Sequence, residues 1–256
     1  MEISKLLKTF SETYGSGGNA AVYFAPGRVN LIGEHTDYNG GLVLPCALSL
    51  GTYLVCRKTG DREFRFATTN FSSRHTVAAD AVAPQPGNAW INYPLGVIAQ
   101  FAKKGLAVPG MDFLFSGNIP NGSGLSSSAS IEVLTAFAVN DMFGFGTEKV
   151  ELALMSQRAE KEFAGVNCGI MDQFASAMGA ENSAIALNCS TLEYELVPLE
   201  LGRHVLIISN TKKQRGLASS KYNERRGECE AAVRNLSAIK PISHLCELDL
   251  DTFLAR

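Results

Sequence analysis

The chain has 256 residues, of which 46% are hydrophobic and 19% are charged, a balance typical of a soluble globular protein with a sizeable core. Its formal net charge of −2 excludes a general affinity for nucleic acid or for anionic membranes. No apolar run approaches the roughly 18 residues of a membrane span, and residues 1–15 lack the pattern of a signal peptide. The six cysteines are scattered without CxxC pairs, so we expect reduced thiols and a cytoplasmic location.

Short apolar runs predict that the chain begins with β-strands. Pro26 and Gly27 interrupt the first run, so we expect a turn between two short strands at that point. The strands expected in this first part cover residues 20–27, 29–33, 47–58 and 62–70. A helix is then expected over 91–105, with lysines in its last turn and a glycine at its end, and a strand over 111–120.

The second half of the chain combines helices and strands. The helix expected over 129–143 is apolar around most of its surface and is therefore predicted to be buried. The next helix is expected over 147–163, with Thr147 as its N-cap and Gly165 beyond its end. The elements expected after it are a helix over 169–179, strands over 183–189, 194–199 and 204–210, a helix over 218–236 and the first turns of another from 249. This mixture predicts an α/β or α+β fold.

Charged residues crowd the segment 25–41, which reads APGRVNLIGEHTDYNGG. Arg28, Glu34, His35 and Asp37 lie here among glycines and apolar residues, in a stretch that is half strand-like and half turn-like. Each of them fits an ordinary solvated surface group. Carboxylates paired in a glycine-bounded loop also suit a polyhydroxylated ligand, because they accept hydrogen bonds from several hydroxyl groups.

A segment rich in glycine and serine, NIPNGSGLSSSAS at 118–130, leads into the helix predicted to be buried. Gly122 and Gly124 let the backbone approach a ligand closely, and the free N–H groups and dipole of a helix N-terminus attract phosphate. Ser126, Ser127 and Ser128 add hydroxyl donors and an oxygen ligand suited to magnesium. The segment has neither the GK[ST] ending of a Walker loop nor a GxGxxG pattern. It fits either a serine-capped helix or a phosphate-binding loop, and a cap needs only one serine.

One carboxylate lies at the apolar start of the helix predicted over 169–179. An unpaired charge is costly to bury there, so Asp172 is either a partner of the helix dipole or a functional acid. Glu160 and Glu162, at the end of the preceding predicted helix, fit a solvated helix face. The residues alone thus indicate a phosphate held by the serine segment, a polyol held by the charged segment, and Asp172 as a candidate base.

In this order, the segments resemble those of the galactokinases, which belong to the GHMP small-molecule kinases. GRVNLIGEHTDYNGG is similar to the galactokinase signature almost residue for residue, and NIPNGSGLSSSAS is similar to the phosphate-binding motif of the family. CGIMDQ at 168–173 and SSKYNERR at 219–226 match further galactokinase segments. The first motif separates galactokinases from mevalonate and homoserine kinases. The resemblance spans essentially the whole chain and implies an α+β fold like domain two of ribosomal protein S5, with a mixed β-sheet packed against helices.

The resemblance implies Mg²⁺-dependent transfer of the γ-phosphoryl group of ATP to the anomeric hydroxyl of α-D-galactose. Asp172 is implied as the catalytic base, with Arg28 beside it stabilising charge in the transition state. The residues implied to bind galactose are Glu34, His35, Thr36, Asp37, Gly169 and Tyr222. Those implied to hold the phosphates of ATP are Gly122, Ser123, Gly124, Leu125, Ser126, Ser127 and Ser128. Ser128 and Glu160 are implied to hold magnesium.

The chain departs from the galactokinase pattern in two places. The segment NTKKQRGLASSKY, which ends at Tyr222, differs from the family. The third, glycine-rich motif of the family, which belongs to a C-terminal domain, does not occur in this sequence. We therefore expect residues 1–205 to form the N-terminal kinase domain and residues 206–256 to begin a C-terminal domain whose remainder is absent. By itself, the chain is expected to self-associate through apolar surface and to be inactive.

Two other functions fit the same motifs. A non-catalytic sensor would bind galactose and ATP without turnover, but known sensors of this type have lost residues from the serine segment, which is complete here. A kinase for a related sugar such as N-acetylgalactosamine would be distinguished by comparing the rates on both sugars. The partners expected are galactose and ATP, and neither nucleic acid nor a membrane.

Overall fold

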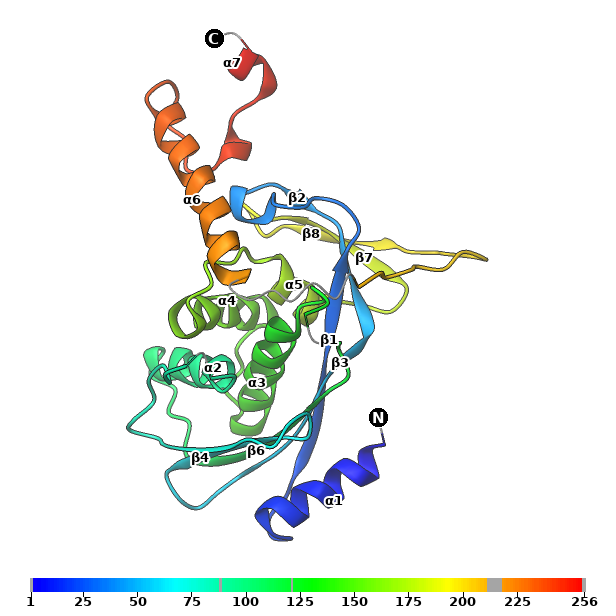
Figure 1. Cartoon of the computed structure of the whole chain (residues 1–256), viewed down its shortest axis with the longest axis vertical. Coiled ribbons are helices and arrows are strands. Elements are labelled where there is room, and N and C mark those ends of the chain that lie inside the picture. Colours follow the sequence, from blue (N-terminus) through cyan, green and yellow to red (C-terminus); the bar gives the residue numbers. More distant parts are fainter. Residues whose placement is uncertain (1, 88, 121, 211–217, 255–256) are drawn as a thin grey trace.

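A mixed β-sheet runs through the centre of the computed structural model, which describes residues 2–87, 89–120, 122–210 and 218–254 (Figure 1). Its strands are β1 (Ala21–Asn30), β2 (Leu42–Val43), β3 (Pro45–Lys58), β4 (Glu63–Thr68), β5 (Arg74–Ala78), β6 (Met111–Gly117), β7 (Ser183–Asn188) and β8 (Tyr194–Pro198). The order across the sheet is β2-β7-β3-β6-β4-β5, with β1 paired to β3 and β8 to β7. Strands β4 and β6 run parallel, and the other paired strands are antiparallel. The long strand β3 pairs with β1, β6 and β7 and so joins the two ends of the sheet.

Helices cover both faces of the sheet near β3, and the alternation of side chains along that strand explains why. One face carries α2 (Asn92–Lys103), α3 (Ser127–Phe143), α4 (Lys149–Ala159) and α5 (Met171–Met178), and the other carries α1 (Ile3–Tyr14) (Figure 1). Leu54 and Cys56 point into the large apolar core beneath the first group. Val55, between them, packs with Leu6 and Phe10 of α1 on the opposite face. The fold is therefore the expected α+β arrangement of a mixed sheet packed with helices.

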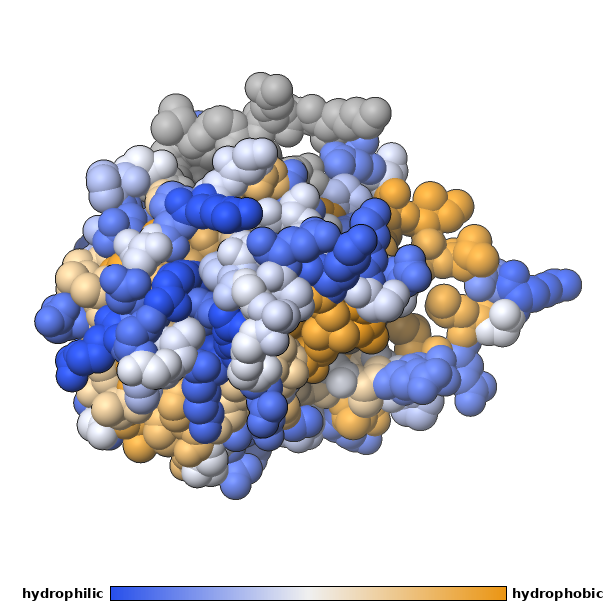
Figure 2. Space-filling model, turned by 90° about the horizontal axis from the view of Figure 1, so that it is seen from below, coloured by the Kyte–Doolittle hydropathy of each residue, from blue (hydrophilic) through white to orange (hydrophobic). Residues whose placement is uncertain are grey.

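The end of the chain extends beyond this layered body. A π-helical turn, Glu160–Ala164, continues α4, and short 3-10 turns occur at Asp37–Asn39 and Leu245–Glu247. Helices α6 (Ala218–Ser237) and α7 (Leu250–Leu254) project past the β2 end of the sheet (Figure 1). An arm formed by residues 199–210 extends sideways from β8, and hydrophobic side chains gather along it (Figure 2).

Within the described residues, no helix combines the length and the apolar character needed to cross a membrane.

The predicted turn at Pro26 and Gly27 is wrong, because both residues lie within the single strand β1. The pairing of β1 with β3 shifts register between Pro26 and Arg28, where residues 48–50 of β3 face the single residue Gly27, so an irregularity in the strand pairing replaces the turn. A Cβ atom at Gly27 would lie 2.6 Å from the Leu125 carbonyl oxygen, and the Arg28 N–H donates to that same oxygen at 3.2 Å. The absence of a side chain at Gly27 thus lets the strand touch the loop that precedes α3.

Two other expectations need correction. Thr147 is not an N-cap: α4 begins after Glu148, and the Asn140 side-chain amide pairs with both the N–H and the carbonyl of Thr147. Residues 204–210 form no strand in the described structure. Val205 is 77% exposed and Ile207 is 83% exposed on the arm, and the described strands pair among themselves rather than with it. An apolar alternating segment needs a neighbouring strand to become part of a sheet.

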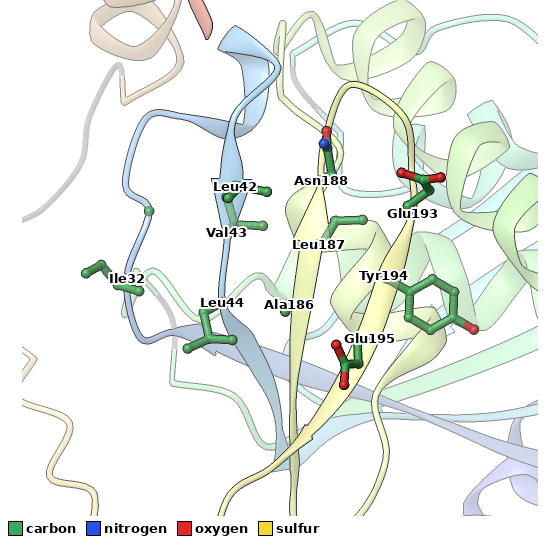
Figure 3. Close-up of a pocket in the computed structure, with 11 residues that line it drawn as sticks. Ile32, Leu42, Val43, Leu44, Ala186, Leu187, Asn188, Glu193, Tyr194 and Glu195 are labelled. Atoms are coloured by element: carbon green, nitrogen blue, oxygen red, sulfur yellow. The ribbon is translucent and has the colours of Figure 1, made fainter. Parts of the chain in front are cut away.

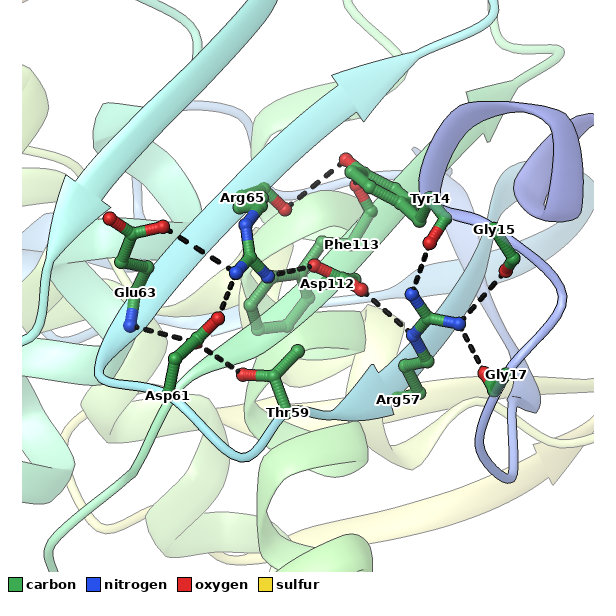
Figure 4. Close-up of polar contacts among 10 residues, drawn as sticks. All are labelled: Tyr14, Gly15, Gly17, Arg57, Thr59, Asp61, Glu63, Arg65, Asp112 and Phe113. Atoms are coloured by element: carbon green, nitrogen blue, oxygen red, sulfur yellow. Dashed lines mark hydrogen bonds and ion pairs between the residues drawn. The ribbon is translucent and has the colours of Figure 1, made fainter.

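A buried carboxylate fastens α1 to the sheet (Figure 4). Asp112 on β6 is 1% exposed and accepts hydrogen bonds from Arg57 of β3 at 2.8 Å and from Arg65 of β4 at 2.7 Å. With its remaining donors, the Arg57 guanidinium binds the C-terminal end of α1 through the carbonyl oxygens of Tyr14, Gly15 and Gly17. Asp112 therefore orients the group that holds α1 in place.

We expect the substitution Arg57→Met to lower the free energy of unfolding by about 3 kcal/mol, because it leaves the buried Asp112 carboxylate with a single cation. Urea denaturation of both proteins measures this difference, and hydrogen exchange should show faster exchange in α1. The matched control is Arg62→Met, at an exposed position, which should leave stability nearly unchanged. Equal losses in the two variants would contradict the role given to Arg57.

Candidate active site

Arg28 of β1, Asp172 of α5 and Ser126 before α3 meet at one point. The Asp172 Oδ1 atom lies 2.7 Å from Nη2 and 3.0 Å from Nε of Arg28, and Oδ2 accepts a hydrogen bond from the Ser126 hydroxyl at 2.6 Å. Arg28 also donates through Nη1 to the Gly124 carbonyl at 2.6 Å. The Asp172 side chain remains 30% exposed, so a small molecule can still reach this carboxylate.

The serine loop, residues 122–128, is not built as a helix cap. Ser126 precedes α3 in the left-handed region, with φ of 61°, and its hydroxyl binds Asp172 instead of capping the helix. Gly122 and Gly124 also have positive φ values, 68° and 75°, which glycine adopts without strain. The Ser123 hydroxyl oxygen is buried, with no hydrogen-bond partner in the described part of the chain. Of the two interpretations open from the sequence, this geometry favours a ligand-binding loop.

The charged loop, residues 33–41, is held by its own polar groups. The Thr36 hydroxyl contacts the carbonyls of Gly33 at 2.7 Å and Leu42 at 2.8 Å, and His35 hydrogen-bonds through Nδ1 to the Tyr38 hydroxyl. Glu34 accepts a hydrogen bond from the Asn30 side chain at 2.9 Å. These contacts leave Glu34 and His35 exposed at the rim of the site and Thr36 occupied within the loop.

Asp37, Gly169 and Tyr222 come together from three distant parts of the chain. Gly169 lies so close to Asp37 that a side chain at position 169 would collide with the Asp37 carboxylate. The Gly169 N–H donates to the Tyr222 hydroxyl at 3.3 Å, and the Tyr222 ring packs against those of His35 and Tyr38. Burial and the nearby negative charge of Asp172 raise the pKa of Asp37 to about 6.

Glu160 is only 6% exposed, so the expectation of a solvated helix face is wrong for this residue. It follows the buried Ser156 by one helical turn and so lies on the inward face of α4, next to the Ser128 hydroxyl. Burial, together with the charge of Asp172, raises the pKa of Glu160. Glu162 does face outward, where it forms an ion pair with Lys103.

The Ser128 and Glu160 oxygens fit a magnesium site. Mg²⁺ prefers hard oxygen ligands and commonly takes only one or two of them from the protein, with phosphate and water supplying the rest. A cation here would also offset the buried negative charge that raises the pKa of Glu160. Among the described residues, no cluster of three or more His, Cys, Asp or Glu side chains could hold a metal ion by itself.

Sequence reasoning missed three polar residues that shape the site. Gln173 donates to Glu160 at 2.6 Å and to Glu132 at 3.0 Å, deep between α3 and α5. Asn223 of α6 binds the Asn167 N–H at 3.0 Å and the Gly165 carbonyl at 3.1 Å, which holds the chain that leads to Gly169. Glu132 could have been noticed as the one acidic residue inside the apolar helix predicted over 129–143, before its polar end.

The segment in which the sequence departs from galactokinases before Tyr222 lies mostly at residues 211–217, outside the described residues.

An apolar groove of about 620 Å³ lies elsewhere, on the part of the sheet formed by β2, β7 and β8 (Figure 3). Leu42 and Ile32, which line it, are 69% and 70% exposed. Neither Arg28, Asp172 nor any residue of the serine loop borders this groove. Arg28, Asp172 and the serine loop therefore lie outside this groove.

Two family models match the two parts of the chain that supply most of the site residues. The galactokinase galactose-binding signature matches residues 8–58, which include the charged loop and Arg28. The N-terminal domain of GHMP kinases matches residues 92–180, which include the serine loop and Asp172.

The chain is similar to curated galactokinases along almost its entire length. It is 52% identical to the galactokinase of Clostridium tetani over 254 residues, 99% of this chain and 64% of that protein. With the galactokinase of Fusobacterium nucleatum it shares 49% identity over 98% of this chain and 66% of that protein. It thus spans slightly less than two thirds of the length of these relatives.

Solved structures support the fold. The structure of Lactococcus lactis galactokinase complexed with galactose matches 99% of this chain and 66% of that chain, with a TM-score of 0.95 and 39% sequence identity. The mevalonate kinase of Methanococcus jannaschii matches with a TM-score of 0.62 over 88% of this chain and 74% of that chain. At 18% identity, the second match supports the fold alone. The expected N-terminal domain fold of GHMP kinases is confirmed.

The raised pKa of Asp37 predicts how stability changes with pH. Since the folded protein binds this proton more tightly than the unfolded chain, the stabilisation is complete below about pH 4 and is lost as the pH rises through about 6. We expect Asp37→Asn to be more stable than wild type by about 3 kcal/mol at pH 8, and to lose this advantage at pH 4.

Thermal and urea unfolding at the two pH values measure this difference. The control Asp80→Asn changes an exposed aspartate, and its stability relative to wild type should not vary in this way. A pH-independent effect of Asp37→Asn would show that the Asp37 carboxylate is not buried as described.

Proposed function

The chain belongs to the galactokinase family of GHMP kinases, and from this premise we propose that the protein transfers the γ-phosphoryl group of ATP to the anomeric hydroxyl of galactose. The observation that carries the proposal is the contact of Asp172 with both Arg28 and Ser126. It places a carboxylate and a guanidinium beside a serine loop, where a hydroxyl nucleophile and a phosphate can be held together. Phosphoryl transfer depends mainly on this kind of positioning and charge stabilisation.

In this proposal, Asp172 accepts the proton of the anomeric hydroxyl. Both of its oxygens already contact donors, which fixes the carboxylate in one orientation. Arg28 holds that orientation and supplies positive charge where the transferring phosphoryl group would develop negative charge. Its planar guanidinium donates to Asp172 and to the Gly124 carbonyl at the same time, so it has little freedom to turn away.

The serine loop and the N-terminus of α3 are proposed to hold the phosphates of ATP. The residues with this role are Gly122, Ser123, Gly124, Leu125, Ser126, Ser127 and Ser128. The free N–H groups at the start of α3 and the buried, unpartnered Ser123 hydroxyl supply donors suited to phosphate. Ser128 and Glu160 would hold Mg²⁺, which neutralises phosphate charge when bound.

The sugar is proposed to lie between the charged loop and Tyr222. Asp37 beside Gly169 provides acceptors for hydroxyl groups, and Glu34 with His35 closes the rim. Thr36 contributes by holding the turn through its two contacts with backbone carbonyls. We assign residues 1–205 to the catalytic N-terminal domain and residues 206–256 to the beginning of a second domain.

Asp172→Asn, introduced into the full-length enzyme, tests the proposed base directly. We expect its kcat to fall by about 10²- to 10⁴-fold because the amide cannot accept the proton, while galactose binding changes little. An assay coupled to ADP release measures the rate, and calorimetry measures sugar affinity. Asp80→Asn, an exposed aspartate far from these loops in the sequence, is the control and should keep the wild-type rate. Near wild-type turnover in Asp172→Asn would refute the assignment.

A pair of variants separates the sugar contacts from the nucleotide contacts. Asp37→Ala should weaken galactose binding by about 1–3 kcal/mol, because a sugar hydroxyl loses its buried acceptor. Ser128→Ala should raise the magnesium concentration needed for half-maximal rate, with little change in sugar affinity. Each variant serves as the control for the other, and an exchange of the two phenotypes would overturn the assignment of the loops.

A further inference from the structure

A buried chain of polar side chains runs from α3 to the π-helical turn. The Gln173 side-chain amide donates through Nε2 to Oε2 of Glu160 at 2.6 Å and to Oε2 of Glu132 at 3.0 Å. Gln173 and Glu132 are both fully buried, each 0% exposed. Neither residue belongs to the loops assigned to sugar or phosphate, so the catalytic proposal leaves this pair without a role.

Two buried oxygens in this chain are unpaired. Oε1 of Glu132 and Oε1 of Gln173 have no hydrogen-bond partner among the described residues. A polar oxygen buried without a partner carries a desolvation cost. Burial and the charge of Glu160 raise the pKa of Glu132 well above its usual value.

The two N–H groups of the Gln173 amide explain how Gln173 and Glu132 together can hold the Glu160 carboxylate in position. An amide can turn about its last bond and exchange its NH₂ group for its oxygen at nearly the same position. Glu132 offers an acceptor on one side, so it favours the orientation in which the NH₂ group lies between the two glutamates. In the reversed orientation, the amide oxygen would face the Glu160 carboxylate and repel it.

We propose that Gln173 and Glu132 are positioning residues for the metal site: Glu132 fixes the orientation of the Gln173 amide, and this amide holds the Glu160 carboxylate beside Ser128. The inference rests on the proposed function, in which Ser128 and Glu160 bind Mg²⁺. Glu160 then contacts the Ser128 hydroxyl on the ligand side, and the Gln173 amide and the Cys168 thiol are its other side-chain partners. Groups that orient a metal ligand in this way typically contribute about 10- to 100-fold in metal affinity.

The test compares the affinity of a non-hydrolysable ATP analogue with and without Mn²⁺, measured by calorimetry on the full-length protein. The Kd without Mn²⁺ divided by the Kd with Mn²⁺ gives the gain in affinity that the metal supplies. This ratio separates the metal contact from the phosphate contacts. We expect Gln173→Met and Glu132→Met to reduce this ratio by about 10- to 100-fold, with metal-free affinity unchanged. Glu132→Gln keeps the acceptor for Gln173 and should retain the wild-type ratio.

The matched control is Gln100→Met on α2. Gln100 is also buried, and it donates to Glu162 at 2.7 Å in the same manner, but it does not contact Glu160 in the described structure. This variant should keep the wild-type ratio. Melting curves show whether each variant is folded. If Gln173→Met does not fold, the Kd ratio of Glu132→Met tests the positioning role by itself.

The outcomes separate this inference from the proposed function. If Glu160→Gln abolishes the metal-dependent gain while Gln173→Met and Glu132→Met retain it, the positioning role is overturned and the metal ligands stand. Equal weakening of nucleotide binding with and without Mn²⁺ also overturns it, since the effect is then one of general structure. If the wild-type protein shows no metal-dependent gain, the assignment of Ser128 and Glu160 fails, and this inference fails with it.

Discussion

The ion pair between Arg28 and Asp172 is the contact on which the candidate site depends. It joins the end of β1 to the first turn of α5, and the same guanidinium binds the Gly124 carbonyl in the serine loop. This reach is possible because Gly27 has no side chain, which lets the strand touch that loop. A planar group with several donors at fixed angles can thus hold a strand, a helix and a loop in one arrangement.

The charge of Asp172 also sets the electrostatics around it. Together with burial, it raises the pKa of Asp37 beside the proposed sugar site and of Glu160 beside the proposed metal site, while Arg28 lowers the pKa of Asp37. In the free protein, therefore, the ionised forms of Asp37 and Glu160 are disfavoured by their surroundings. Sugar hydroxyls and a divalent cation are the two kinds of group that such oxygens bind best, so the proposed ligands would relieve a cost that the fold carries without them.

Much of this arrangement could be predicted from the sequence, and the exceptions have physical causes. Strong periodicity located the main helices and most strands, and the crowding of charges and serines located both loops. Periodicity failed at Pro26 because an irregularity in the strand pairing lets a strand continue through a residue pair that usually marks a turn. The expectation for Glu160 is wrong for another reason: this residue follows the buried Ser156 by four positions, so it lies on the inward face of α4, where a carboxylate is unusual. The partners of Gln173 lie 13 and 41 positions away in the chain, beyond any local pattern.

The two halves of the site are linked through consecutive residues of α5. Successive side chains on a helix differ in direction by about 100°, so Asp172 can face Arg28 while Gln173 faces Glu132 and Glu160. A rotation of α5 would displace the proposed base and the support of the metal ligand together. Apolar packing of Phe174 and its neighbours against β7 opposes that rotation. The precision of the proposed chemistry therefore depends on how tightly the hydrophobic core holds one short helix, as much as on the polar residues themselves.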